Sequence, residues 1–198
     1  MAIIVEHDKR KHEILQKSLD VFIDEGYEDA TFQKIADRCG ITRTTLYIYF
    51  KNKHEIFLGS IRELLSQLEM TLKVVILDKE LSPEKKLRRT LKTIVDQFEN
   101  NVKLFSVLLN YLLQLKKSGV DTNQRVRRRI IRVRHLLSNI IIEGINKGDF
   151  KDCNVKDMNE LLYSLMESAI FRISVLNLTD MSDTRLAMNA VVDSLLKR

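Results

Sequence analysis

The chain has 198 residues, of which 44% are hydrophobic and 30% are charged. This composition is typical of a globular protein that buries a core, and it excludes an intrinsically disordered chain. The length allows one large domain, or a small domain attached to a larger one. The formal net charge of +6 permits a nucleic-acid partner without requiring one.

The two cysteines, Cys39 and Cys153, are too few for a disulfide framework and indicate a reducing compartment. The first eight residues, MAIIVEHD, lack the basic head and long apolar stretch of a secretory signal. The longest charge-free run, residues 104–115, is shorter than the ~18 residues that would suggest a membrane span. We therefore expect a cytoplasmic protein.

One proline and six glycines in a Leu-, Ile-, Lys- and Glu-rich chain favour long helices with short connections. In chain order, apolar periodicity and capping residues predict helices over residues 8–25, 32–39, 43–49, 53–77, 83–99, 102–117, 122–147, 155–178 and 182–197. The predicted fold class is all-α, with about nine helices. We expect two domains, over residues 1–52 and over residues 53–198.

The two short helices around Gly40 have the features of a helix-turn-helix. Glycine supplies the positive φ of the turn, and Ala36 is small enough for the helices to approach closely. Ile41 and Leu46 are expected to be buried and to set the crossing angle. The second short helix, capped by Thr42, then projects its amino-terminal residues outward.

The outward residues suit a DNA major groove, because arginine makes bidentate contacts to guanine and threonine hydrogen-bonds bases or touches thymine methyls. Five basic residues between positions 31 and 54 (Lys34, Arg38, Arg43, Lys51 and Lys53) oppose one acid, Asp37. Such local excess charge suits a surface that meets phosphates. The predicted DNA-binding residues are Thr31, Thr42, Arg43, Thr44, Thr45, Tyr47, Tyr49, Lys51 and Lys53.

Residues 26–57 closely resemble the DNA-binding region of TetR-family (tetracycline-repressor-like) regulators. The matching positions are Gly26-Tyr27, Thr31, Ile35-Ala36, Cys39-Gly40-Ile41-Thr42, Leu46-Tyr47, Tyr49-Phe50, Lys53 and Ile56-Phe57. They span the whole predicted helix-turn-helix and the start of the next helix. Tyr49 stands where many relatives carry histidine. Beyond residue 57 the resemblance is one of helix number, length and the Gly144–Phe150 segment.

The resemblance implies a helix-turn-helix DNA-binding domain over residues 1–52 and a ligand-binding and dimerisation domain over residues 53–198. It thereby implies a homodimer and a small-molecule pocket. The last two helices would pair with their copies, and their predicted interface residues are Leu161, Leu165, Ala169, Ile173, Leu186, Ala190 and Val191. The four helices over residues 53–147 would enclose the pocket. The candidate ligand-binding residues are Phe98, Phe105, Leu109, Asn110, Tyr111, Leu113, Gln114, Glu143, Tyr163 and Met166.

These pocket assignments have simpler alternatives. Each apolar candidate fits plain core packing equally well, and each polar one fits a solvent-facing or internally hydrogen-bonded side chain better than a ligand contact. The arginines of residues 125–134 are interpreted first as a solvated or ion-paired face. The second interpretation is an anchor for an anionic head group, such as the phosphates of an acyl-CoA.

The sequence predicts no enzyme, cofactor or metal site. It has no glycine-rich phosphate loop, no nucleophile elbow and no convincing carboxylate pair. The four histidines show no ligand spacing with either cysteine. We expect a homodimeric repressor that a small, hydrophobic ligand releases from a palindromic operator. The alternative is a DNA-binding regulator whose C-terminal domain serves only dimerisation or a protein partner.

Overall fold

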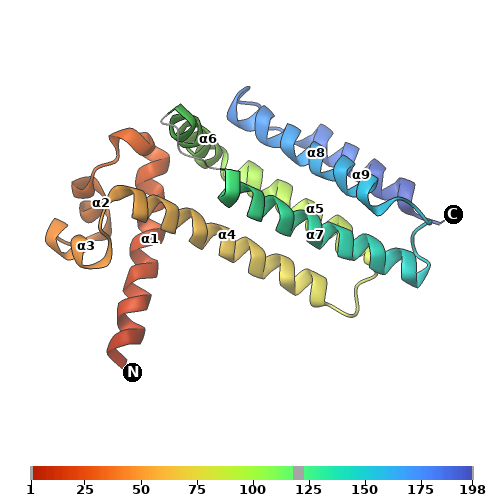
Figure 1. The fold of residues 1–198 in the computed structure, drawn as a ribbon, viewed down its shortest axis with the longest axis horizontal. Coiled ribbons are helices and arrows are strands. Elements are labelled where there is room, and N and C mark those ends of the chain that lie inside the picture. Colours follow the sequence, from red (N-terminus) through yellow and green to blue (C-terminus); the bar gives the residue numbers. More distant parts are fainter. Residues whose placement is uncertain (1, 118–122, 198) are drawn as a thin grey trace. The chain divides into compact units, whose positions relative to one another are not determined.

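The computed structural model describes the backbone of residues 2–117 and 123–197, and side chains over residues 6–117 and 131–197. Within these ranges the chain forms nine α-helices (Figure 1). They are α1 (Ala2–Asp29), α2 (Phe32–Cys39), α3 (Arg43–Tyr49), α4 (Lys53–Leu77), α5 (Pro83–Asn100), α6 (Val102–Lys117), α7 (Asn123–Lys147), α8 (Val155–Ser174) and α9 (Ser182–Leu195). The all-α prediction is confirmed.

Side-chain caps begin the helices where the sequence predicted them. Thr31, Thr42 and Ser82 each accept a hydrogen bond from the backbone N–H three residues later, at 3.2, 3.0 and 3.3 Å. Asn52 Oδ1 accepts from the Glu55 N–H at 2.9 Å. Pro83 follows its cap at the first helical position, where its missing N–H leaves no helical bond unmade.

Several predicted helix ends differ from the structure. The helix α1 begins at Ala2 rather than residue 8, because nothing in residues 2–7 breaks a helix. At its other end Gly26 leaves the helical region, with φ 82°, and a further turn continues to Asp29. The helix α8 ends at Ser174 rather than residue 178, and Asn177 then adopts the left-handed region with φ 55°. The helix α9 ends at Leu195 rather than residue 197.

The chain divides into two compact units, residues 1–70 and 71–198. The first turns of α4 therefore belong to the N-terminal unit, although the sequence analysis placed the boundary at residue 52. The reason is packing: Ser60 Oγ donates to the Leu15 carbonyl at 2.6 Å, and the position of a Cβ on Gly59 would lie 2.6 Å from Leu15 Cδ2.

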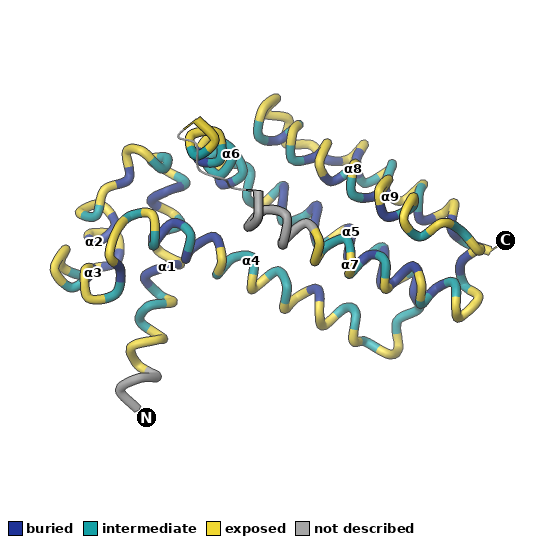
Figure 2. Tube along the Cα trace, in the orientation of Figure 1, coloured by how far each residue is buried: buried dark blue, intermediate teal, exposed yellow. Residues whose placement is uncertain are grey.

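In the C-terminal unit, α5 and α8 contact each other, and each also contacts α6, α7 and α9. Figure 2 colours the buried residues of these helices dark blue. The buried hydrophobic residues of α5 include Leu87, Leu91, Ile94, Val95 and Phe98, and those of α8 are Leu162, Met166, Ala169 and Ile173. An isolated antiparallel bridge pairs Phe150 with Leu196, which joins the turn after α7 to the end of α9.

Candidate nucleic-acid interface

The N-terminal unit is built around an aromatic cluster. The ring of Phe22 meets that of Phe57 edge-on at 4.9 Å, and Tyr27 lies 5.0 Å from Phe57. Phe22 and Phe57 are fully buried. Edge-to-face pairs of this kind add to the stability that burial itself gives. The cluster joins α1 to α4 and so supports the two short helices between them.

The turn between α2 and α3 is closed through Gly40, whose φ of 67° and ψ of 36° are left-handed. Its N–H donates to the Asp37 carbonyl at 3.1 Å, and the Ile41 N–H donates to the Ala36 carbonyl at 3.0 Å. Ala36 and Leu46 are fully buried, as the sequence predicted, whereas Ile41 is only half-buried. These contacts direct the amino-terminal end of α3 away from the core.

The exposed start of α3 carries the predicted base-reading residues. The Thr42 hydroxyl accepts from the Thr45 N–H at 3.0 Å and lies 2.8 Å from the Thr45 hydroxyl, so the cap holds both threonines in place. Arg43 and Thr44 are exposed, and Thr45 is half-buried. The structure therefore presents one arginine and one threonine freely, beside two threonines that bond to each other.

Tyr47 lies under Arg43. Arg43 Nη2 donates to the Tyr47 hydroxyl at 3.2 Å, and the guanidinium lies 5.7 Å from the centre of the tyrosine ring. Tyr47 in turn stacks on Phe32 of α2 at 4.5 Å, with 48% of its surface exposed. The phenol thus orients the arginine, and α2 orients the phenol.

The remaining predicted DNA-binding residues outside α3 differ in exposure and in their hydrogen bonds. Thr31 is exposed while its hydroxyl caps α2. Lys51 is exposed, and its backbone N–H donates to Glu55 at 2.8 Å. Lys53 is half-buried, since its ammonium donates to the Glu28 carbonyl at 2.8 Å.

The same ammonium lies 4.7 Å above the ring of Tyr27. Burial raises the pKa of this tyrosine above its ordinary value, with a smaller contribution from the charge of Glu28. The phenol therefore stays protonated. The Lys53 ammonium contacts α1 in this structure, and its contact with a phosphate stays a prediction.

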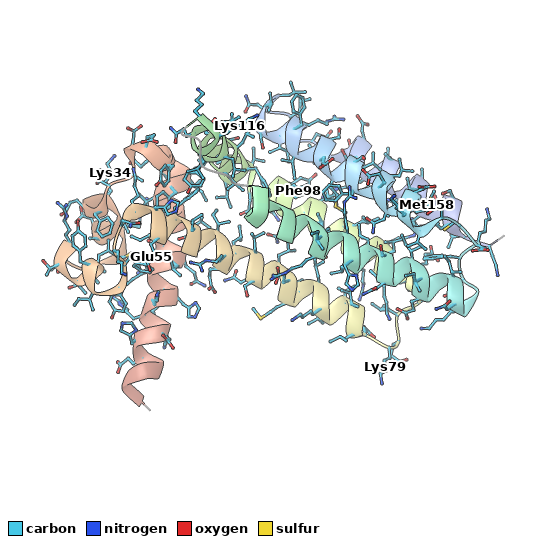
Figure 3. All side chains as sticks on the ribbon, in the orientation of Figure 1. Lys34, Glu55, Lys79, Phe98, Lys116 and Met158 are labelled. Carbon is cyan, nitrogen blue, oxygen red and sulfur yellow. The ribbon has the colours of Figure 1, made fainter. Side chains whose placement is uncertain are left out.

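The excess of basic over acidic residues between positions 31 and 54 is partly balanced in the structure by acids from elsewhere in the chain. Lys34, labelled in Figure 3, pairs with Glu25 at 2.6 Å. Arg38 pairs with Asp24 at 2.9 Å and lies 3.8 Å from Asp20. The acids of α1 thereby balance both cations of α2, which leaves Arg43, Lys51 and Lys53 as the basic residues around α3.

Two side chains that the sequence analysis did not associate with α3 contact it. The ring of His7 stacks on Tyr49 at 4.7 Å, and the Lys11 ammonium lies 5.3 Å above the ring of Phe50. The predicted start of the first helix at residue 8 left His7 outside the helix. Its spacing of four residues from Lys11, on an unbroken helical sequence, was the available signal.

The ten candidate ligand-binding residues do not form one surface. Phe98 (labelled in Figure 3), Tyr111 and Met166 are buried, and Phe98 meets the half-buried Phe105 edge-on at 5.1 Å. Leu109 is half-buried. The candidates Asn110, Leu113 and Gln114 are exposed. An open groove between α5 and α9, lined by Arg88, Arg89, Leu91, Lys92, Val95, Arg185, Met188 and Asn189, contains none of the ten.

The carboxylate of Glu143 accepts hydrogen bonds from two lysines. Lys86, which is buried, donates to both carboxylate oxygens at 2.9 and 3.1 Å, and Lys147 donates to one of them at 2.7 Å. The hydrogen bond from Lys147, followed by that from Lys86, holds the pKa of Glu143 below its ordinary value. The internally bonded alternative therefore describes this residue.

Tyr163 is half-buried beneath Arg134, whose guanidinium lies 4.4 Å from the ring centre. Burial raises the pKa of Tyr163 above its ordinary value. Arg134 also pairs with Glu160 at 2.7 Å. The side chains of Arg125, Arg127, Arg128 and Arg129, which form most of the predicted arginine face, lie outside the described residues.

The predicted dimer residues divide into two groups. Leu161 and Leu186 are 45% and 68% exposed, Ala190 is exposed, and Leu165 and Val191 are half-buried. Ala169 and Ile173 are fully buried within the unit, unlike the other five. Both lie on the side of α8 that packs within the unit, and Phe171 and Val175 are exposed instead, at 55% and 47%.

Among the residues that the structure describes, no helix has the length and apolar character to cross a membrane. Comparison with known proteins assigns residues 14–59 to the family "Bacterial regulatory proteins, tetR family". This span covers all of α2 and α3, and it confirms the resemblance drawn from the helix-turn-helix residues.

Relatives extend the similarity beyond that span. The chain is 23% identical over 159 residues to a fatty acid metabolism regulator protein of Bacillus subtilis, covering 80% of each chain. It is 38% identical over 52 residues to the transcriptional activator FasR of Mycolicibacterium smegmatis, covering 26% of this chain and 24% of that protein.

Solved structures share the fold. A TetR transcription regulator from Haloarcula marismortui superposes with a TM-score of 0.83 at 24% identity, covering 96% of this chain and 100% of that one. The regulator FadR of Bacillus subtilis, in complex with stearoyl-CoA, gives 0.69 at 21% identity, covering 93% and 97%.

Proposed function

Because this chain belongs to the tetR family of bacterial regulatory proteins, we propose that it acts as a homodimeric repressor on a palindromic operator. The observation that carries this proposal is the start of α3, where Arg43 and Thr44 are exposed on a helix that a glycine turn and a buried leucine hold outward. An arginine so placed can contact O6 and N7 of a guanine together, and a threonine can contact a thymine methyl.

In this proposal the surfaces of α8 and α9 form the dimer. Leu161 and Phe171 of α8, Val175 directly after α8, and Leu186 of α9 are each at least 45% exposed. An isologous interface buries the same patch on both copies, and exposed apolar side chains favour such burial. The two α3 helices must then match half-sites one helical turn apart, about 34–36 Å.

The proposed effector is a hydrophobic molecule with an acyl chain. Two observations on similar proteins support it: one relative is named a fatty acid metabolism regulator, and one similar fold was solved with stearoyl-CoA. In this protein the apolar side chains of Phe98, Phe105 and Leu109 are the groups that would contact the acyl chain of the ligand. To switch the DNA-binding state almost fully, the ligand must bind one state more tightly than the other by about 5.5 kcal/mol.

The experiment has two stages. The full chain is used to select from randomised duplexes, and the recovered sequence is tested by fluorescence anisotropy against a scrambled duplex of equal composition. We expect a palindromic sequence, and a ratio of one dimer to one palindrome or a multiple of it. A chain that recovers no preferred duplex, or that remains monomeric at the concentrations used, refutes the proposal.

In the second stage, the operator complex is titrated with stearoyl-CoA, and with free coenzyme A as the matched control. We expect release with the acyl compound alone, together with thermal stabilisation of the free protein that follows the mass-action relation. If saturating stearoyl-CoA and a panel of lipophilic compounds all leave the operator affinity unchanged, release by an acyl ligand is refuted. That result supports the alternative in which the C-terminal unit serves dimerisation or a protein partner.

A further inference from the structure

The helix α1 extends beyond what the core of its unit requires. It begins at Ala2, and among its residues whose side chains are described Ile14 is the first that is buried, since residues 6–13 are exposed or half-buried (Figure 2). Most helical stability in proteins comes from packing of an apolar face. Residues 6–13 bury no such face, so their position in the helix draws attention to contacts of another kind.

The described contacts of these residues with other helices go to α4, where His12 Nδ1 lies 2.8 Å from Glu63 Oε2, and to the carboxyl end of α3. His7 stacks on Tyr49, the last residue of α3, with 4.7 Å between ring centres and 25° between planes. Lys11 places its ammonium 5.3 Å from the ring of Phe50, the residue that caps α3. His7 and Lys11 are four residues apart, so they share one face of α1. This face, the His7–Lys11 face, adjoins the helix proposed to read DNA.

Three acids lie in this segment. Glu6 and Asp8 precede and follow His7, about 100° to either side of it around the helix, and Asp8 Oδ1 is 3.9 Å from His7 Nδ1. Glu13 pairs with Arg10 at 2.8 Å. The Lys11 ammonium is the charged group of the face that the structure places over a ring at the end of α3. The attraction between a cation and an aromatic ring keeps it at that end of the helix.

Geometry indicates what that charge meets. Tyr49 follows Arg43 by six residues, which at 1.5 Å per residue is about 9 Å along α3. The major groove is about 12 Å wide, and phosphate backbones border it. When the first turn of α3 reaches base edges, its last turn therefore lies near a bordering backbone.

We propose that the His7–Lys11 face of α1 is a second DNA-contact surface, in which Lys11 binds a backbone phosphate of the duplex while His7 positions Tyr49 toward the same strand. This inference rests on the proposed function. Its contact carries no sequence information, because phosphate contacts place a protein on DNA and base contacts specify the site. It adds affinity for operator and random duplex alike.

The test measures duplex affinity against salt concentration for Lys11→Gln, with Lys9→Gln as the matched control. Lys9 is exposed on the same helix but about 200° from His7, so it loses the same charge on the opposite side. Losing one phosphate contact makes the slope of log K against log salt less steep by about 0.9. If the variant and the wild type bind equally at 1 M salt, the variant therefore binds about eightfold more weakly than the wild type at 0.1 M salt. We expect that change in Lys11→Gln, on both duplexes, and neither change in Lys9→Gln.

Conservative variants separate contact from folding. Lys11→Arg keeps the charge, so we expect a wild-type slope. His7→Phe keeps a ring to stack on Tyr49, so we expect wild-type affinity, whereas His7→Ala weakens binding to both duplexes. Circular dichroism establishes that each variant retains the helical content of the wild type.

The outcomes distinguish this inference from the proposed function. Wild-type protein that binds no duplex contradicts the proposed function itself. Wild-type protein that binds, with equal salt slopes for Lys11→Gln and Lys9→Gln, overturns only the α1 contact. Affinity losses in Lys11→Arg or His7→Phe as large as those in Lys11→Gln or His7→Ala also overturn it, because they assign the effect to structure rather than to charge and stacking.

Discussion

Replacing Gly144 with alanine tests the packing that joins α7 to the end of the chain. A Cβ at this position would lie 2.1 Å from Cδ2 and 2.4 Å from Cε2 of Phe150, which is fully buried. The ring cannot swing away without moving its backbone, because the N–H groups of Phe150 and Asp149 both donate to the Gly144 carbonyl at 3.0 Å. Phe150 is also bridged to Leu196.

The expected loss of stability is about 2 kcal/mol, where the two possible costs, each reduced by the helix propensity of alanine, meet. Overpacking a filled core costs about 1–3 kcal/mol, and expelling a phenylalanine ring costs about 3–5 kcal/mol. Alanine recovers about 1 kcal/mol relative to glycine through its helix propensity. In a chain of this size each kcal/mol lowers Tm by about 2–4 °C.

Urea and thermal unfolding, followed by circular dichroism at equal protein concentration, measure the change. The control is the same substitution in a Phe150→Ala background, where the vacated space accepts the methyl group. There we expect Gly144→Ala to be neutral or stabilising, and the cycle isolates the contact between the two positions. If Gly144→Ala unfolds at or above the wild-type midpoint, or costs the same in both backgrounds, the steric reasoning is wrong.

The other predictions concern DNA, assembly and pH. Arg43→Ala should lose about 1–3 kcal/mol on the selected operator and little on random duplex, whereas Lys53→Ala should weaken both alike; equal losses for the two variants on both duplexes contradict these roles. Leu186→Glu places a charge on a side chain that is 68% exposed, so analytical ultracentrifugation should show dissociation at concentrations where the wild type is dimeric, with helical content unchanged; a retained dimer would exclude this part of α9 from the interface. The lysine hydrogen bonds lower the pKa of Glu143, so the carboxylate stabilises the fold above its ordinary pKa of 4.5 and loses that contribution as pH falls through the lower folded value. The stability difference between wild type and Glu143→Gln should therefore shrink in that acid range, and a constant difference from pH 6 to pH 3 would be inconsistent with the ion pairs.

Local sequence determined where most helices begin and end. Thr31, Thr42 and Ser82 cap helices through bonds to residues three positions later, so their effect can be read without knowing the fold. The left-handed turn at Gly40 is local in the same sense, because the residue type decides which backbone region is accessible. The helix-turn-helix and its exposed Arg43 followed from these signals.

Partners far apart in sequence were beyond such reasoning. Glu143 was assigned to a ligand because it is a polar group in an apolar stretch, yet Lys86, 57 residues earlier, bonds to it. Lys34 and Arg38 were counted as free charge, and the acids of α1 pair with both. Which charges meet depends on how helices pack, and no local pattern specifies that.

The sequence by itself determined the helical class and the positions of several helix caps, because apolar periodicity and hydrogen bonds within a few residues set them. Only the tertiary structure decided which side of α8 is buried. The helix is apolar on more than one face, so its periodicity did not distinguish Leu161 from Ile173. Packing against the neighbouring helices buries Ile173, whereas Leu161 stays 45% exposed. The tertiary structure likewise decided that His7 stacks on Tyr49, because no local pattern specifies which helix a side chain of α1 will contact.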